Sequence, residues 1–305
     1  MIEVKGLTKR YGDRVAVDHI SFSAKSGEIV GLLGPNGAGK TTTMRMLTGY
    51  MPPNEGTARI AGFDILDDSM EARKRVGYLP ERVPLYPDMT VRGYVTFWAQ
   101  LRGIRNPRKQ VDAALGRVQM MDRQNQLVRN LSKGLRQRLG LAQALVHNPP
   151  VIILDEPTIG IDPQQVIEVR ESVRALGKDH TVLFSTHILS EAEQVCDRVL
   201  IINEGQIVAQ GKPADLRRQL EPKTHLSVVI GGATEKQALK LLKDIAGVEN
   251  VSREGEGYTL TCASNRDIRG DVSSRVMQAG YSLLEMHQAT SSLEDIFLEV
   301  VSKSS

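Results

Sequence analysis

The stretch of residues 34–41 combines glycines, one lysine and one hydroxyl side chain at the spacing G-x-x-x-x-G-K-[ST]. Glycines let the backbone turn tightly and point successive N–H groups at an anion, so this spacing predicts a phosphate-binding loop. We expect Lys40 to reach β- and γ-phosphates and Thr41 to ligate Mg²⁺, with Thr42 as a further phosphate donor. The phosphate-binding residues expected here are Gly34, Pro35, Asn36, Gly37, Ala38, Gly39, Lys40, Thr41 and Thr42.

Two carboxylates, Asp155 and Glu156, end the short apolar run VIILDE. Such a run is typical of a buried parallel strand, whose carboxyl end is where a ligand binds. Asp155 is expected to hold Mg²⁺ through water, and Glu156 to accept a proton from the attacking nucleophile. His187 follows the next predicted strand, at 181–185, and is therefore expected at the same sheet edge. Paired acids at a strand end and single histidines are common in proteins, so each alone is a weak signal. With a phosphate loop upstream in the same chain, their combination strongly indicates a site for phosphate and Mg²⁺.

The elements that must position these residues are predicted from hydrophobic periodicity. Residues 29–33 form an apolar run typical of a buried strand, and residues 41–47 predict a short helix. Residues 2–30 alternate strand-like runs with turns, which favours an antiparallel β layer. In one of these turns, the ring of Tyr11 is expected either to stack on a base or to lie half-buried at the surface.

Residues 84–146 show helical spacing and indicate a helical subdomain. It carries Tyr86, Tyr94 and Trp98, which are expected to be core residues or anchors for a partner protein.

Three helix starts are predicted from capping residues. Ser132 precedes an amphipathic helix in the run LSKGLRQR, and Asp162 precedes Pro163 at the start of another. Ser190 and Glu193 match a capping box for a third helix.

The C-terminal part has a different pattern. A charged, proline-containing linker is expected at 219–224, which separates a domain of residues 1–218 from one of residues 225–305. The order β-α-β-β-α-β in the second domain predicts a ferredoxin-like α+β sandwich, with a last helix at 293–301 packed against it. No catalytic constellation occurs in this domain.

Composition narrows the possible functions. The chain has 305 residues and a formal net charge of +3, with no basic block, so we expect no nucleic-acid partner. No signal or transit peptide is expected from the first residues, and no apolar run approaches the roughly 20 residues that span a bilayer. We therefore expect a soluble chain. Cys196 and Cys262 lack metal-ligand spacing and are expected to be packing residues in a reducing compartment.

Together, the motifs in residues 2–218 resemble the ATP-binding-cassette (ABC) ATPase family. The resemblance rests on the order of Tyr11, the phosphate loop, VGYLPE, LSKGLRQR, VIILDEP, GIDP and STH. It implies an α/β P-loop NTPase cassette, with a mixed core sheet, an antiparallel β layer and a helical subdomain. It also implies ATP and Mg²⁺ as ligands.

The resemblance further implies a head-to-tail homodimer, in which Ser132 and Gly134 of one copy face the γ-phosphate bound by the other. Asp162, in GIDP, belongs to the same expected ATP site. The family is associated with a membrane permease, so we expect a cytoplasmic subunit that is peripheral on the inner face of the membrane and powers transport, in the export direction. YLPE and SLEDIFLEV resemble the gliding-motility or multidrug-type exporter branch. A soluble regulatory ABC ATPase is the alternative, and a neighbouring permease would distinguish the two.

Two motifs depart from the family pattern. The LSGGQ motif is LSKGL in this chain, a change for which we expect no loss of function. The family's glutamine at the hinge is Glu81, which is expected either to contact Mg²⁺ and the nucleotide site or to point to solvent or the permease.

Overall fold

The computed structural model describes residues 1–220, 223–255, 257–263 and 267–289. The chain divides into two compact units, Met1–Pro213 (unit 1) and Ala214–Ser305 (unit 2). No helix among the described residues is both long enough and apolar enough to cross a membrane.

Within the described residues of unit 1, six strands form a mixed sheet in the order β10-β9-β3-β8-β7-β6. All neighbours are parallel except β10, which is antiparallel to β9. Every residue of β3, β7 and β8 is buried, as their continuous apolar runs predict. The strands are β3 (Ile29–Leu33), β6 (Val76–Leu79), β7 (Val151–Asp155), β8 (Thr181–Thr186), β9 (Arg198–Asn203) and β10 (Gln206–Gly211).

A second, antiparallel sheet is built from residues 2–64 in the order β2-β1-β4-β5. This confirms the predicted β layer. Its strands are β1 (Ile2–Tyr11), β2 (Arg14–Ala24), β4 (Glu55–Ile60) and β5 (Phe63–Asp64). Alternate residues of β1 and β4, such as Ile2, Val4 and Ile60, point into one core shared with Val30 and Leu32 of β3.

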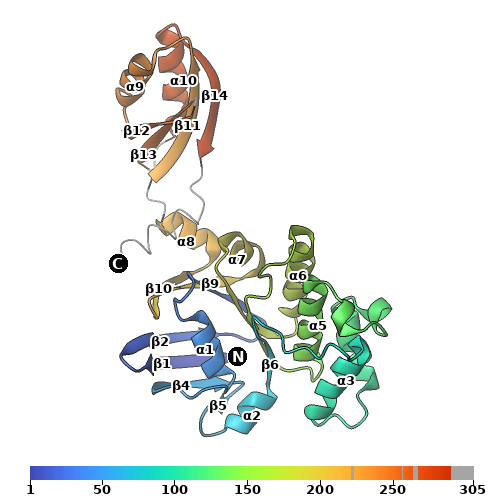
Figure 1. Cartoon of the computed structure of the whole chain (residues 1–305). Coiled ribbons are helices and arrows are strands. Elements are labelled where there is room, and N and C mark those ends of the chain that lie inside the picture. The colour runs from blue at the N-terminus through green and yellow to red at the C-terminus, as the bar shows by residue number, and fades with distance from the viewer. Residues whose placement is uncertain (221–222, 256, 264–266, 290–305) are drawn as a thin grey trace. The chain divides into compact units, whose positions relative to one another are not determined.

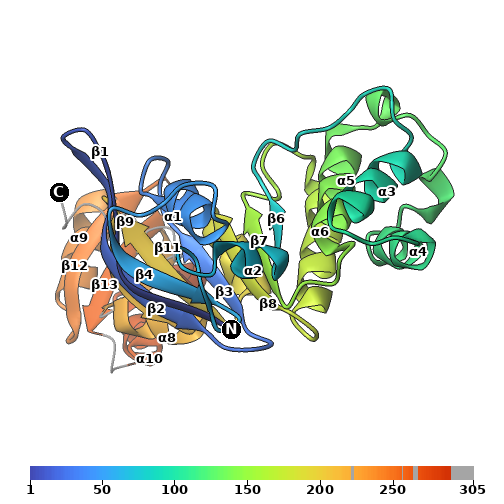
Figure 2. The ribbon, with the colours of Figure 1, turned by 90° about the horizontal axis from the view of Figure 1, so that it is seen from below.

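The helices of unit 1 include the predicted helical subdomain, which is confirmed. Figures 1 and 2 both show α3, α4 and α5 gathered at one end of unit 1, away from the antiparallel sheet. The helices are α1 (Lys40–Leu47), α2 (Ser69–Lys74), α3 (Val91–Leu101), α4 (Arg108–Arg117), α5 (Lys133–Leu145), α6 (Pro163–Leu176) and α7 (Leu189–Val195), with short 3₁₀ turns at Met121–Arg123 and Val128–Asn130.

The aromatic side chains of the helical subdomain form one cluster. Tyr94 is fully buried, its ring lies 6.3 Å from that of Trp98, and its hydroxyl donates to Pro84 O at 3.2 Å. Tyr94 is therefore a core residue, and the alternative expectation of an exposed anchor is wrong. Tyr86 is 45% exposed and packs edge-on against Phe97 at 5.6 Å.

Two of the three predicted helix caps are present. Ser132 Oγ accepts from Leu135 N at 3.3 Å, and Asp162 Oδ1 accepts from Gln165 N at 3.1 Å. The predicted capping box of Ser190 and Glu193 is wrong, because α7 already begins at Leu189 and has no side-chain cap.

In unit 2, the described residues from 223 to 289 form the predicted β-α-β-β-α-β order, in an antiparallel sheet ordered β12-β13-β11-β14. The ferredoxin-like class of this unit remains a prediction, and the predicted last helix at 293–301 lies outside the described residues. Helix α8 extends to Leu220 and β11 begins at Lys223, so regular structure covers most of the expected linker. The elements are α8 (Pro213–Leu220), β11 (Lys223–Gly231), α9 (Glu235–Lys243), β12 (Val248–Glu254), β13 (Gly257–Ala263), α10 (Arg269–Gln278) and β14 (Ser282–Ala289).

The cap of α3 yields a test of the helical subdomain. Thr90 Oγ1 accepts from Gly93 N at 3.0 Å, so Thr90→Ala should lower the free energy of unfolding of unit 1 by about 1 kcal/mol. Thr90→Ser keeps the acceptor and should lose much less. Urea unfolding followed by the fluorescence of Trp98, the only tryptophan, measures both. Equal stability of the alanine and serine variants would contradict a stabilising cap.

Candidate functional site

The loop between β3 and α1 forms the predicted phosphate-binding turn. Gly39 has φ of 108°, a conformation that side chains disfavour, and an added Cβ would lie 2.5 Å from Ala16 O. The Lys40 side chain folds back over the loop, where Nζ donates to Gly34 O at 2.7 Å and to Pro35 O at 3.1 Å. The buried ammonium thus lies at the centre of the turn.

Asp155 connects the loop to the end of β7. Its Oδ1 accepts from Ser185 Oγ at 2.7 Å and from Thr41 Oγ1 at 3.2 Å. Burial raises the pKa of Asp155, these two hydrogen bonds lower it, and the charges of Glu156 and Glu81 raise it again. Oδ2 is buried and has no hydrogen-bond partner among the described residues. A buried carboxylate oxygen without a donor, beside a threonine hydroxyl, fits the hard oxygen ligands that Mg²⁺ takes.

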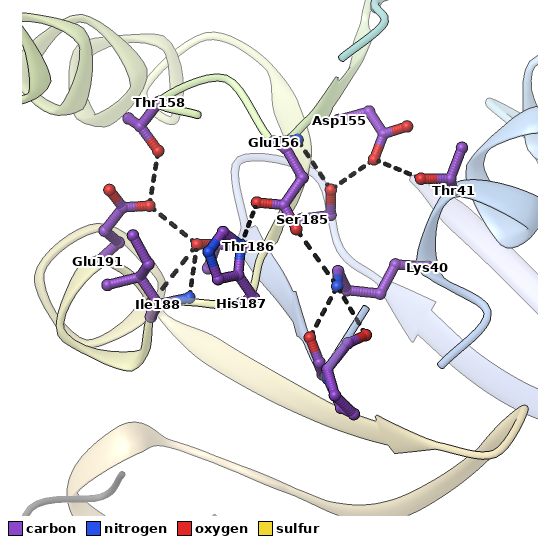
Figure 3. Close-up of polar contacts among 12 residues, drawn as sticks. Lys40, Thr41, Asp155, Glu156, Thr158, Ser185, Thr186, His187, Ile188 and Glu191 are labelled. Atoms are coloured by element: carbon purple, nitrogen blue, oxygen red, sulfur yellow. Dashed lines mark hydrogen bonds and ion pairs between the residues drawn. The ribbon is translucent and has the colours of Figure 1, made fainter. Parts of the chain in front are cut away.

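Glu156 lies between the loop and the end of β8 (Figure 3). One carboxylate oxygen, Oε1, is 3.2 Å from Lys40 Nζ, and the other, Oε2, is 2.8 Å from His187 Nδ1. The side chains of Lys40 and Glu156 are 6% and 7% exposed, so this pair is screened little by solvent, whereas His187 is 37% exposed. The predicted meeting of Glu156 and His187 at one sheet edge is therefore confirmed.

A cavity of about 510 Å³ opens beside the loop. Among the predicted site residues, Asn36, Gly37 and Gly39 line it, together with Tyr11, Lys40, Thr41, Thr42, Glu81 and Glu156. Tyr11 is 47% exposed, and its hydroxyl donates to Met51 Sδ at 3.0 Å. Glu81 is thus at the cavity wall, although it comes from the segment after β6. Pro35 and Ala38 line an adjoining hollow that shares Asn36 and Gly37 with this cavity.

Ser132, Gly134 and Asp162 do not line this cavity within one chain, and neither do Gly34, Asp155 and His187. The first two begin α5, where a Cβ on Gly134 would lie 1.5 Å from Gln165 Oε1 of α6. A larger residue at that position would therefore require the Gln165 side chain to move. Asp162 caps α6. The expected contact of Ser132 and Gly134 is with nucleotide bound by a second copy. This contact remains a prediction, as does the place of Asp162 in the ATP site.

Two site residues were not predicted from the sequence. Arg14 lines the cavity beside Tyr11, because the two-residue turn between them pairs these residues across the β1–β2 hairpin. Ser185 donates to Asp155 and accepts from Glu156 N at 3.0 Å. The parallel register places Ser185 opposite Asp155, which strand lengths alone do not specify.

Family models match both parts of the chain. Residues 17–159 match the model described as ABC transporter, and residues 211–301 match the model of the ATP-binding protein DrrA1-3-like C-terminal domain.

Similar proteins extend over nearly the whole sequence. The linearmycin resistance ATP-binding protein LnrL of Bacillus subtilis (strain 168) is 31% identical, and the match covers 99% of each chain. The Nod factor export ATP-binding protein I of Ralstonia nicotianae is 37% identical over 99% of this chain and 94% of its own. The bacitracin transport ATP-binding protein BcrA of Bacillus licheniformis is 33% identical over 99% and 97%.

Solved structures agree for the cassette. An ATP-binding subunit of an ABC transporter matches with a TM-score of 0.65 and 32% identity, over 72% of this chain and 92% of its own. A dimeric ATP-binding cassette in a post-hydrolysis state with ADP and Pi matches with a TM-score of 0.62 and 25% identity, over 70% and 99%. The phosphate loop, the acidic strand end and these matches identify the chain as a member of the ABC transporter family, in which it is an ATP-binding and ATP-hydrolysing subunit.

Proposed function

We propose that this subunit hydrolyses ATP with Glu156 as general base, and that the contact between Glu156 and His187 sets the geometry of the step. Water attacks the γ-phosphorus, its proton passes to Glu156, and the bond to the ADP oxygen breaks. His187 holds one carboxylate oxygen at 2.8 Å, which leaves the other directed at Lys40 and the loop. The contact of His187 with Glu156, which lines the cavity, is the observation that supports the proposal most directly.

Thr41 and Asp155 are the proposed ligands of Mg²⁺, and Glu81 is a further candidate. When bound, the ion would neutralise negative charge that develops on the phosphates. A cation would also compensate the buried Asp155 carboxylate, whose pKa is raised by burial.

We propose that two copies associate head to tail, so that Ser132 and Gly134 of one copy complete the ATP site of the other. The amino end of α5 is suited to this role, because helix N-termini attract phosphate oxygens. The dimeric post-hydrolysis cassette among the similar structures supports such an arrangement.

The transport role is proposed to be export through a separate membrane permease, with the subunit on the cytoplasmic face of the membrane. Two of the relatives are named for Nod factor export and for linearmycin resistance. Of the predicted permease anchors, Tyr86 is exposed and Trp98 is half-buried in the helical subdomain, so both remain candidates. The full chain should co-purify with membranes through a permease. Purification from lysate without any membrane protein would favour a soluble regulatory ATPase.

Glu156→Gln should keep ATP binding and lower hydrolysis by roughly 10² to 10⁴, because the amide cannot accept the proton. The variant should also accumulate as an ATP-bound dimer, detectable by size exclusion. Glu171→Gln, an exposed carboxylate on α6, is the matched control and should hydrolyse ATP normally. Near-normal turnover of Glu156→Gln would remove Glu156 from this role.

Tyr11→Ala should weaken ATP binding by about 1–3 kcal/mol, as expected for the loss of a ring that stacks on a base. Tyr11→Phe should bind almost normally, since the hydroxyl contacts only a thioether sulfur among the described residues. Nucleotide titrations measure both variants. Equal affinities for the alanine variant and the original protein would make Tyr11 an ordinary surface residue.

Glu81→Gln should raise the affinity for metal-free ATP by about 1 kcal/mol, because it removes one negative charge beside the phosphates. The affinity for Mg²⁺-ATP should change much less, since the cation offsets the Glu81 charge. Calorimetric titrations with and without Mg²⁺ measure the difference. Equal shifts in both conditions, or none, would contradict a metal-dependent approach of Glu81 to the nucleotide.

A further inference from the structure

A buried carboxylate, Glu191 of α7, lies behind the proposed catalytic pair. Its side chain is 1% exposed. One oxygen, Oε2, accepts hydrogen bonds from Thr158 Oγ1 at 2.7 Å and from Thr186 Oγ1 at 2.9 Å. The other, Oε1, lies 3.3 Å from Arg170 Nη2. Glu191 thus receives two hydroxyl donors and one guanidinium donor.

The two threonines belong to the two segments that carry the reacting groups. Thr158 follows Glu156 by two residues, and Thr186 directly precedes His187. Thr186 Oγ1 also accepts from Ile188 N at 3.0 Å, which fixes the backbone on the other side of His187. Figure 3 shows Glu191 between Thr158 and Thr186, with the contact between His187 and Glu156 nearby. A single carboxylate oxygen therefore connects both segments.

Core packing alone would not require a charge at this place. Burying a carboxylate costs several kcal/mol unless strong donors compensate it, and an apolar side chain of similar volume would often be no less stable. Arg170 supplies compensation, but the hydroxyl donors could have come from any neighbouring element. They come from the segments after β7 and at the end of β8, which must keep Glu156 and His187 in hydrogen-bond contact.

We propose that Glu191 is a positioning residue for ATP hydrolysis: it holds His187 against Glu156 through Thr186 and Thr158, without touching the nucleotide. This proposal depends on the proposed role of Glu156 and His187. It adds Glu191 as the group that sets the distance between Glu156 and His187. A misplacement of about 1 Å in an active site can lower the rate of reaction by about 10²-fold.

The kinetic test uses the full chain and its basal ATPase activity. Glu191→Leu should lower kcat by about 10²-fold, whereas KM for ATP should stay within about twofold, because Tyr11, Lys40 and Thr41 belong to other elements. Thr158→Val removes one of the two hydroxyl donors and should lower kcat by about tenfold, the worth of one hydrogen bond to a charged group. Glu168→Gln on α6, whose carboxylate pairs with Arg138 at 2.6 Å on α5, should leave kcat unchanged.

A spectroscopic readout separates positioning from general support of the fold. The ring ¹⁵N shifts of His187 should move toward those of a solvated histidine in Glu191→Gln and in Thr158→Val, while those of His147 and His180 stay in place. Both controls are buried or half-buried histidines in other contacts. This measurement requires no ATP hydrolysis. If Glu191→Leu does not fold, Thr158→Val and Glu191→Gln still test the proposal.

The outcomes distinguish a failure of the positioning role of Glu191 from a failure of the general-base role of Glu156. Low kcat with shifted His187 signals supports a positioning role for Glu191. Unchanged kcat, or a loss of kcat with the His187 signals in place, overturns it. If Glu156→Gln hydrolyses ATP normally while the His187 signals still shift in the Glu191 variants, the proposed general base fails, but the structural coupling between Glu191 and His187 stands.

Discussion

The parallel pairing of β3, β8 and β7 is the constraint on which the site depends. Parallel neighbours bring the carboxyl ends of different strands to one edge, and the register aligns Leu33 with Thr186 and Asp155 with Ser185. The phosphate loop, the two carboxylates and His187 follow these three strand ends directly. Residues separated by more than a hundred positions thereby become neighbours, and a change of register would move them to the other face of the sheet.

The same edge concentrates charge in a poorly solvated place. Four charged side chains are buried at this edge, and each has compensating partners: Lys40, Asp155, Glu156 and Glu191. Lys40 contacts loop carbonyls and the Glu156 carboxylate, and Asp155 accepts from two hydroxyls. Glu156 contacts a lysine and a histidine, and Glu191 contacts two threonines and an arginine. Lys40 is expected to reach the β- and γ-phosphates, whose oxygens would then replace the loop carbonyls as its partners. Its existing hydrogen bonds keep the ammonium satisfied before the nucleotide arrives, at little cost in reorganisation.

The helical subdomain relates to this site through α5 and α6. Gly134, in the run LSKGL, packs closely against Gln165, and the loop before α6 follows Glu156 directly. The surface proposed to face a second copy, at the amino end of α5, therefore packs against α6, whose amino end follows β7 after a short loop. Arg170, on the same helix, contacts Glu191. Helix α6 thus connects the predicted dimer surface with the residues that hold His187, so a displacement of this helix would affect both.

The sequence by itself determined the elements and most of the site, because phosphate binding needs a local pattern of glycines, Lys40 and Thr41, and because continuous apolar runs specify buried strands. It also predicted the β-α-β-β-α-β order of unit 2. The sequence left open whether Tyr94 is a core residue or a partner anchor, because helical spacing does not show which neighbours cover a side chain; the structure shows that it is a core residue. The contacts of Ser185 and Glu191 were decided only by the tertiary structure. Their partners come from strand register and helix packing, which bring together residues that share no local sequence pattern.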